Sequence, residues 1–179
     1  MASAFTHAFS AVVIGKAMSS RSHRLKFWLL GMFCAAMPDL DVIAFRFGIS
    51  YSSMWGHRGF THSIFFSVLF GIFIATVFFR KFKVGSDTWG KLSLYFFLCT
   101  LSHGFLDMLT NGGKGVALYA PFSAERFFLP FRPVLVSPIH ASQFFGEWGM
   151  QVMISEFYWI WFPGMVFLAI IWLVRKAQA

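Results

Sequence analysis

Residues 64–79 read IFFSVLFGIFIATVFF, an apolar stretch without a single charged side chain, and a segment of this kind decides the fold. Over the whole chain of 179 residues, 58% are hydrophobic and only 12% are charged. A soluble domain carries about 25% charged residues. Too little polar surface therefore remains to cover a water-facing globule, and we predict an all-α integral membrane protein.

Further apolar stretches of helical length lie at residues 4–18, 25–47, 92–109 and 157–174. Between residues 111 and 155 the chain is rich in aromatic residues, and its prolines exclude one continuous helix. We expect this segment to lie on the membrane interface. The prediction is a single membrane-embedded domain, residues 1–179. It has about five transmembrane or membrane-embedded helices and a long aromatic interfacial loop (about 111–155) before the last helix. The first stretch lacks a basic leading region, so we expect it to stay in the mature protein.

The net charge of +8 comes largely from short basic clusters between the apolar stretches. These clusters are Arg21, Arg24 and Lys26; Arg80, Lys81, Lys83 and Lys91; and Arg175 and Lys176. Positive residues beside membrane spans usually face the cytoplasm, so these clusters predict the topology of the chain. Because the topology accounts for the positive charge, we expect no nucleic-acid partner. Five crossings with an outer N-terminus place all three clusters in the cytoplasm.

The same topology gathers most of the His and Asp residues at the outer ends of the helices. They are His7, Asp39, Asp41, His57, His62, His103 and Asp107, against His23 and Asp87 at the cytoplasmic ends. Ionisable residues near membrane spans are costly and usually have partners or a function.

The spacing of these residues indicates how they act. His103 and Asp107 are four residues apart and share one helix face, so both can reach one ion, or the Asp can simply hold the His by a hydrogen bond. Asp39 and Asp41 follow Pro38. Both can turn inward, one can cap a helix while the other binds an ion, or both can cap.

Residues 57–63, His57-Arg58-Gly59-Phe60-Thr61-His62-Ser63, form the most distinctive stretch. Gly59 permits a bend and Thr61 can cap the helix that follows. The two histidines suit metal binding or acid–base chemistry, and the planar guanidinium of Arg58 suits a phosphate. Mixed His and Asp ligands suit Zn²⁺, Mn²⁺ or Fe²⁺.

With the motifs Pro38-Asp39-Leu40-Asp41, 57–63 and His103-Gly104-Phe105-Leu106-Asp107, the chain resembles the YdjM-like family of bacterial inner-membrane proteins. Pro121-Phe122-Ser123 and Arg126 also resemble this family, which is described as LexA-regulated, membrane-bound metal-dependent hydrolases. More remotely, it is similar to zinc-dependent phospholipase C and single-strand nucleases.

The resemblance implies a divalent metal, Zn²⁺ before Mn²⁺ or Fe²⁺. The ligands it implies are Asp39, His62, His103 and Asp107, with His7 completing the site. The soluble enzymes also use a later His-x-x-x-Glu pair. Here His140 and Glu147 have the wrong spacing, so one or two ions are expected rather than three.

The predicted function is metal-dependent hydrolysis of a phosphoester in a membrane lipid, at the extracytoplasmic face of the bacterial inner membrane. Asp41, His57 and Arg58 are the candidate catalytic residues, and Arg58, Arg126 and Arg132 the candidates for binding the phosphate. Two alternatives belong to other classes. One is a transporter of protons or metal ions, and the other is a non-catalytic scaffold with a structural metal.

Overall fold

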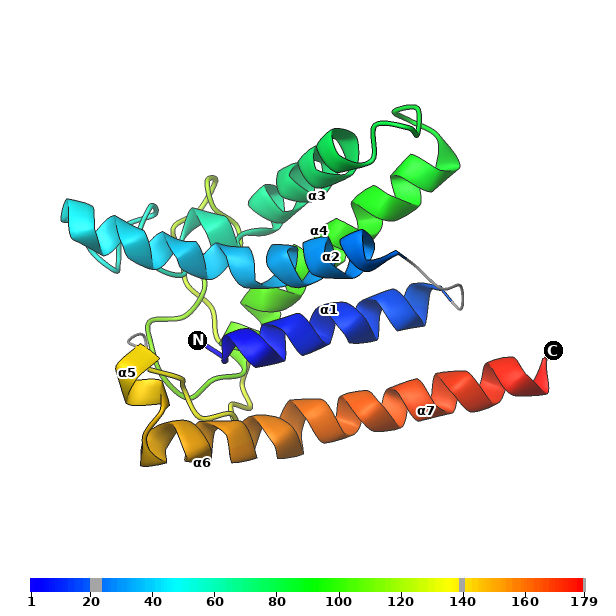
Figure 1. The fold of residues 1–179 in the computed structure, drawn as a ribbon. Coiled ribbons are helices and arrows are strands. Elements are labelled where there is room, and N and C mark those ends of the chain that lie inside the picture. Colours follow the sequence, from blue (N-terminus) through cyan, green and yellow to red (C-terminus); the bar gives the residue numbers. More distant parts are fainter. Residues whose placement is uncertain (20–23, 139–140, 179) are drawn as a thin grey trace.

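The structure, a computed structural model, describes residues 1–19, 24–138 and 141–178. The regular elements in these ranges are all helical (Figure 1). They are α1 (Ala4–Met18), α2 (Leu25–Ala36), the 3-10 helices η1 (Met37–Phe47) and η2 (Phe60–His62), α3 (Ile64–Phe78), α4 (Asp87–Met108), α5 (Ala141–Phe144), α6 (Glu147–Glu156), the π-helix η3 (Phe157–Trp161) and α7 (Phe162–Ala177).

The predicted all-helical class is confirmed for the described residues, but the helix predicted at 92–109 begins earlier, at Asp87, and the last one is part of the longer helix Glu147–Ala177. The first has the predicted bounds, and the third ends one residue early. Residues 25–47 form α2 and η1 without a break, because Pro38 fits the first turn of the 3-10 segment. The predicted loop at 111–155 is wrong in its last part, where residues 141–156 contain α5 and α6.

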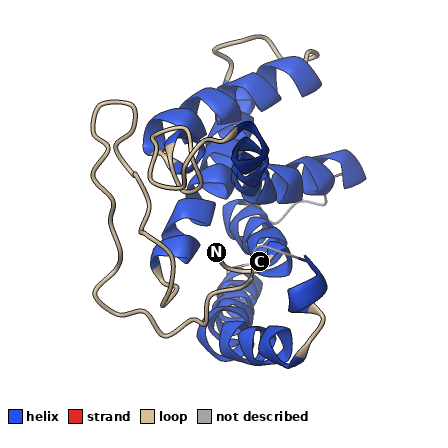
Figure 2. Ribbon diagram, turned by 90° about the vertical axis from the view of Figure 1, so that its left-hand side faces the viewer, coloured by secondary structure: helices blue, strands red, loops and turns tan. Residues whose placement is uncertain are grey.

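The helices run in alternating directions, so different segments of the chain lie at the two ends of the bundle (Figure 1). Residues 1–3, η1, the end of α4 and α6 lie at one end, which we call the aspartate end. The start of α2, the turn between α3 and α4 and the end of α7 lie at the other, which we call the basic end. In Figure 2 the irregular chain between α4 and α5 runs along one side of the helices.

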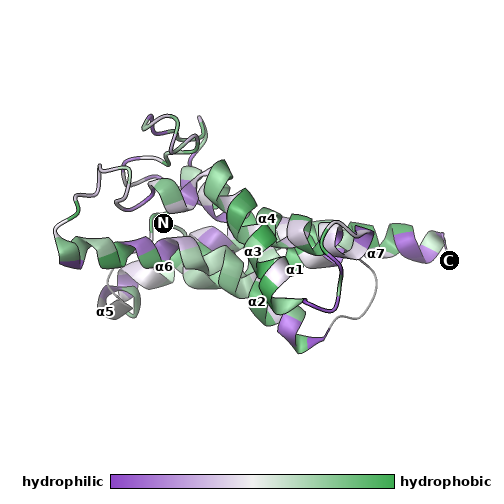
Figure 3. Cartoon of the chain, turned by 90° about the horizontal axis from the view of Figure 1, so that it is seen from above, coloured by the Kyte–Doolittle hydropathy of each residue, from purple (hydrophilic) through white to green (hydrophobic). Residues whose placement is uncertain are grey.

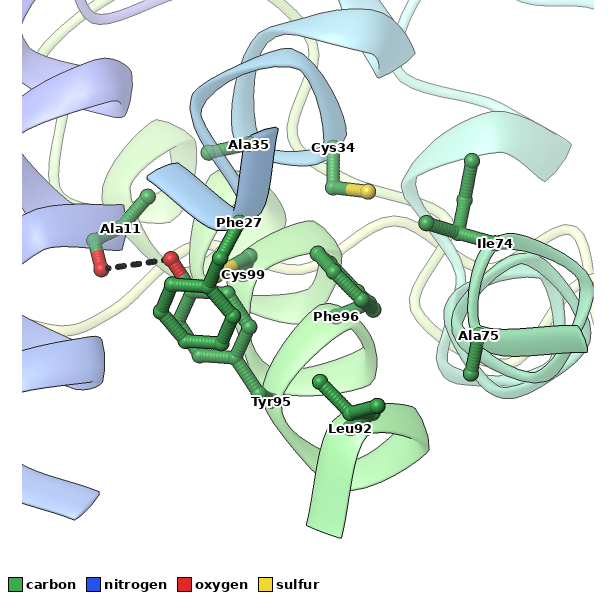
Figure 4. Close-up of a cluster of buried hydrophobic side chains, with 10 residues drawn as sticks. All are labelled: Ala11, Phe27, Cys34, Ala35, Ile74, Ala75, Leu92, Tyr95, Phe96 and Cys99. Atoms are coloured by element: carbon green, nitrogen blue, oxygen red, sulfur yellow. Dashed lines mark hydrogen bonds between the residues drawn. The ribbon is translucent and has the colours of Figure 1, made fainter. Parts of the chain in front are cut away.

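Helices α1 to α4 pack around a cluster of buried side chains that includes Phe27, Tyr95 and Phe96 (Figure 4). The Phe27 and Tyr95 rings are stacked with centroids 4.1 Å apart, and the Tyr95 hydroxyl donates to the Ala11 carbonyl at 3.2 Å. Gly31 makes this contact possible, since an added Cβ there would lie 2.0 Å from the Tyr95 hydroxyl oxygen. Small residues thus let the helices approach closely, as in membrane bundles.

By length and composition, two helices of the described chain are suited to cross a membrane. They are Leu25–Phe47, with a mean hydropathy of 1.5, and Glu147–Ala177, with 2.0. Helices α1 and α3 are apolar but shorter, and α2 and α3 are mostly hydrophobic along their length (Figure 3). The expected number of about five spans stays a prediction.

Candidate metal centre

Asp39 and Asp41 lie on η1, the 3-10 helix that continues α2. Such a helix has about three residues per turn, so side chains two residues apart point about 120° away from each other. Asp39 Oδ1 lies 3.3 Å from His103 Nε2, whereas Asp41 Oδ1 lies 2.7 Å from His57 Nδ1. Of the arrangements that the sequence left open, the structure therefore has the first, in which both carboxylates turn inward, Asp39 toward α4 and Asp41 toward the 57–63 loop.

His103 and Asp107 lie one turn apart on α4 and are fully buried, as predicted from their spacing. Nδ1 of His103 lies 2.7 Å from the main-chain carbonyl oxygen of Ala35, and because a carbonyl only accepts, this nitrogen carries a proton. Pro38 has no N–H to donate to this carbonyl in the 3-10 pattern, which leaves the oxygen available. The neutral His103 ring therefore presents the lone pair of Nε2 to the centre.

A tight bend places His57 and His62 on the other side of the centre. Arg58 within it adopts the left-handed region with a φ of 61°, which is unusual for a residue with a side chain. At Gly59 an added Cβ would lie 2.0 Å from the Met54 carbonyl oxygen, so only glycine fits there. The predicted bend at this glycine is confirmed.

The cap predicted for the following helix is wrong. Ser63, rather than Thr61, caps α3, and its hydroxyl accepts from the Phe66 N–H at 3.0 Å. Thr61 lies in the preceding 3-10 turn, so its hydroxyl points away from the start of α3 and donates to Asp41 Oδ2 at 2.8 Å.

The Asp41 carboxylate contacts several groups of the bend at residues 57–62. Besides Thr61, it accepts from the Arg58 N–H at 3.1 Å and lies 2.7 Å from His57 Nδ1 and 3.2 Å from His62 Nδ1. A carboxylate behind a histidine fixes which nitrogen carries the proton and how the ring is turned. Asp41 thus turns His62 Nε2 toward the centre. Catalytic roles for Asp41 and His57 stay predictions, and the geometry gives Asp41 a supporting position.

Four side-chain atoms from η1, η2 and α4 converge at this point. Nε2 of His62 and of His103 lie 3.0 Å apart, and Asp39 Oδ1 lies 3.8 and 3.3 Å from them. Asp107 Oδ2 lies 3.7 and 4.0 Å from the same two nitrogens, and all four atoms are within 4.8 Å of one another. Ligands of a tetrahedral Zn²⁺ at about 2.0–2.1 Å are separated by about 3.4 Å. The spacing therefore fits one divalent cation.

Two further observations fit a cation. Since Nδ1 of His62 and of His103 each face an acceptor, both Nε2 atoms carry lone pairs when the rings are neutral. Two lone pairs 3.0 Å apart repel each other unless a proton or a metal ion lies between them. In addition, Asp39 Oδ1 is buried without a hydrogen-bond partner, which is rare for buried polar atoms, whereas Asp107 Oδ2 forms an ion pair with the Arg58 guanidinium.

His7, from α1, lies beside this group rather than within it. Its ring is stacked on that of His103 with centroids 3.7 Å apart, and its Nε2 lies 3.7 Å from Asp107 Oδ1. Both ring nitrogens are buried without a hydrogen-bond partner. His7 is thus close enough to take part in a second ion or a rearranged site, and its role as a ligand stays a prediction.

The negative charge around His62 also affects its titration. Burial disfavours the imidazolium, but hydrogen bonds with the three surrounding aspartates outweigh this cost and hold the pKa of His62 well above its ordinary value. In the absence of a metal ion, a proton on this ring is therefore the simplest way to balance the carboxylates.

The three predicted phosphate-binding arginines lie in different environments. Arg58 is fully buried, with Nε 2.9 Å from Asp107 Oδ2, and its terminal amino groups donate to the Gly112 carbonyl and the Thr110 hydroxyl oxygen. Arg126 is half-buried, and its terminal amino groups donate to five main-chain carbonyls of the surrounding loops. Burial lowers the pKa of Arg126. Arg132 is exposed beside the Phe128 ring. The contacts of the first two favour structural roles, and substrate binding stays a prediction for all three.

The sequence analysis missed Glu156, a fully buried carboxylate on α6. It accepts hydrogen bonds from the N–H and hydroxyl of Ser3 and, at 2.7 Å, from the hydroxyl of Thr6. The same N-terminal segment donates from the Ala2 N–H to Asp107 Oδ1 at 2.8 Å. Glu156 is the one acid among the mostly apolar residues 148–177, and an acid in such a stretch is a signal that points to a buried contact.

Some residues of the sequence analysis lie outside the described residues. These are Arg21 and His23, before α2, and His140, before α5. Glu147 begins α6.

Comparison with known proteins gives consistent results. The sequence profile of the YdjM inner membrane protein family matches residues 1–179. The inner membrane protein YbcI of Escherichia coli (strain K12) is 37% identical over 176 residues, which cover 98% of this chain and 100% of that protein. No solved structure matches the chain.

Proposed function

The chain belongs to the YdjM family of inner membrane proteins, and from this premise we propose that it is a metal-dependent hydrolase. The resemblance predicted from its motifs is thereby confirmed. The observation that carries the proposal is the convergence of Asp39, His62, His103 and Asp107 on one point, where Asp39 Oδ1 is buried without a hydrogen-bond partner. We propose a phosphoester of a membrane lipid as the substrate.

The proposed orientation follows from the two ends of the bundle. Basic residues at the starts and ends of helices face the cytoplasm in most inner membrane proteins. With the basic end inside, α1, α2–η1, α3, α4 and α6–α7 would cross the membrane in alternating directions, and the aspartate end would face the periplasm. A lipid of the outer leaflet would then meet the metal centre at the depth of its headgroup.

The residues of the chain have distinct parts in this proposal. A divalent cation at the site would supply a nucleophile at neutral pH, because it lowers the pKa of a coordinated water to about 7. The Ala35 carbonyl and Asp41 orient His103 and His62. Asp39 is the most exposed of the four candidate ligands, with 14% of its side-chain surface accessible, so it is the group best placed to meet a substrate and to accept the proton that the attacking water would lose.

The surroundings of the aspartate end favour a lipid over a soluble substrate. Phe122, Phe131 and Phe145 between α4 and α6 are 81%, 61% and 82% exposed. Exposed aromatic side chains of this number are typical of a membrane interface. Arg132, exposed in the same segment, is the arginine best placed to meet a phosphate headgroup.

Metal content and turnover, measured on the same purified protein, test the proposal. We expect wild-type protein to contain about one divalent ion per chain by elemental mass spectrometry and to hydrolyse members of a panel of phospholipids and isoprenoid phosphates in detergent. His103→Ala and Asp107→Ala should lose both. Asp87→Asn, at an exposed carboxylate of the basic end, is the matched control and should lose neither. Wild-type protein that is folded and turns over lipid without a metal would refute the proposal.

One observation favours a second candidate, a structural metal. Catalytic zinc sites usually keep one position open, whereas structural sites have four protein ligands, and four converge here. If the metal is structural, Asp39→Ala should lower the melting temperature as much as His103→Ala does. If it is catalytic, Asp39→Ala should retain metal with three ligands while the rate of turnover changes.

A further inference from the structure

A second candidate site lies at the basic end, away from the metal centre. It is a cavity of about 690 Å³ between the start of α2, the end of α3 and the start of α4. Four cationic side chains line it: Arg24, Lys26, Arg80 and Lys81. The described residues that line it include no acidic side chain. We call it the basic cavity.

The surplus of positive charge there is not compensated nearby. Of the chain's seven acidic residues, only Asp87 lies in the elements of the basic end, and it pairs with Lys91 at 2.6 Å. The elements and loop that carry the other six lie at or toward the aspartate end (Figure 1). Helices α2 and α4 both begin beside the cavity, so their N-terminal dipoles add to its positive potential. An anion is therefore the complementary ligand.

Capping of α3 explains only part of this arrangement. Lys26 donates to the carbonyl of Phe78, and Arg80 Nε donates to that of Val77 at 3.1 Å, so these two cations also satisfy the last turn of α3. Arg24, the N-cap of α2, makes no side-chain capping bond, and the Lys81 ammonium lies 4.7 Å from the Phe82 ring centroid. Cations from two separate segments thus surround one cavity.

The walls of the basic cavity are apolar. Phe27 and Leu92 form part of the lining and are only 7% and 9% exposed, and Phe79 and Phe82 line it as well. A free inorganic anion gains nothing from such walls, whereas a lipid places its phosphate among the cations and its acyl chain against the aromatic rings. Basic cavities between helices on the cytoplasmic side are suited to anionic headgroups. We propose that the basic cavity binds the phosphate headgroup of an anionic phospholipid.

Native mass spectrometry of the full-length protein in detergent tests this site. The probes are phosphatidylglycerol, phosphatidylcholine with the same acyl chains, and inorganic phosphate. We expect one phosphatidylglycerol to bind more tightly than phosphatidylcholine. Because each cation near an anionic lipid surface contributes about 1 kcal/mol, Arg80→Gln/Lys81→Gln should weaken phosphatidylglycerol binding about 10- to 30-fold. Both side chains are exposed, so the variant should keep its melting temperature.

The matched control is Lys83→Gln/Lys91→Gln, which removes the same charge from the same end but outside the cavity lining. It should change phosphatidylglycerol binding less than twofold. Equal losses in the two double variants would mean diffuse attraction to the basic end and would overturn the proposal. So would equal binding of phosphatidylcholine, or displacement of the lipid by millimolar inorganic phosphate. Phosphatidylglycerol binding to the wild-type protein should weaken with added salt, and binding that does not weaken would also contradict the proposal.

Discussion

The substitution Asp41→Asn tests whether the Asp41 carboxylate orients the metal ligand His62 or takes part in catalysis itself. The substitution keeps the shape of the side chain and one acceptor oxygen but removes the negative charge. That oxygen can occupy the Oδ2 position and still accept from the Arg58 N–H and the Thr61 hydroxyl, now 3.1 and 2.8 Å away. The new amide group then faces His57 Nδ1, which can accept in its other neutral form. The bend should therefore survive, while His62 loses the carboxylate behind its Nδ1.

The expected effect is on metal affinity. Loss of a partner behind a histidine ligand typically costs 10- to 100-fold in affinity, or about 1.4–2.8 kcal/mol. Stability should change less, because the main hydrogen bonds are kept. In Asp41→Ala, by contrast, the Arg58 N–H loses its acceptor, and each buried donor left unpaired costs about 1–3 kcal/mol. The alanine variant should therefore melt at a clearly lower temperature than the asparagine variant.

The assay is competition for Zn²⁺ between each variant and a chromophoric chelator, with turnover measured at saturating metal. We expect Asp41→Asn to need more metal than wild-type protein for half occupancy and to recover most of its turnover once saturated. Asp87→Asn controls for the loss of one carboxylate. Wild-type metal affinity combined with no turnover at saturation would refute this reasoning and would make Asp41 a catalytic residue.

Three further substitutions test other parts of the structure. Pro38→Ala adds an N–H that competes for the Ala35 carbonyl, so metal affinity should fall severalfold in the chelator assay although no candidate ligand changes; unchanged affinity would contradict this. Arg58→Lys cannot reproduce the guanidinium contacts and should lower the free energy of unfolding in detergent by about 2 kcal/mol, whereas wild-type stability would show those contacts to be dispensable. Gly31→Ala should cost about 1–3 kcal/mol, because its Cβ would lie 2.0 Å from the Tyr95 hydroxyl oxygen. The added substitution Tyr95→Phe should restore part of that loss, and no recovery would place the clash elsewhere.

Much of the fold is predictable because apolar length and proline act locally. The stretches at residues 4–18 and 64–79 match α1 and α3 to within one residue. Residues 141–155 were assigned to the loop 111–155 because its prolines exclude one continuous helix, although all four of those prolines lie before residue 141. These residues are helical in the structure, where α6 gains the buried contact between Glu156 and the N-terminal segment. The acid itself signals a buried contact, but its partners Ser3 and Thr6 lie about 150 positions away and cannot be identified from the local sequence.

The candidate site was predictable in its members but less so in their roles. Charge bias and helix spacing bring seven His and Asp residues to one end, and the four that the family resemblance implies as ligands, Asp39, His62, His103 and Asp107, converge in the structure. The directions of Asp39 and Asp41 depend on a 3-10 helix in place of an α-helix, which the sequence does not state. The contacts of Arg58 depend on a left-handed backbone and on residues more than 50 positions away.

The carbonyl of Ala35 is a component of the centre that belongs to no side chain. Any residue at position 35 that is small enough for the buried cluster and leaves α2 undistorted would supply the same oxygen, because Ala35 is fully buried and its side chain serves the packing alone. Scanning mutagenesis, which replaces side chains, would therefore report the packing at this position and would not reveal the role of the oxygen. What the oxygen does depend on is the axial position of α2 against α4, since a small slide of one helix along the other would move the acceptor away from His103. The protonation of the His103 ring therefore depends on the packing of α2 against α4. A change of bilayer thickness or of detergent that alters this packing would change the metal centre without altering any ligand.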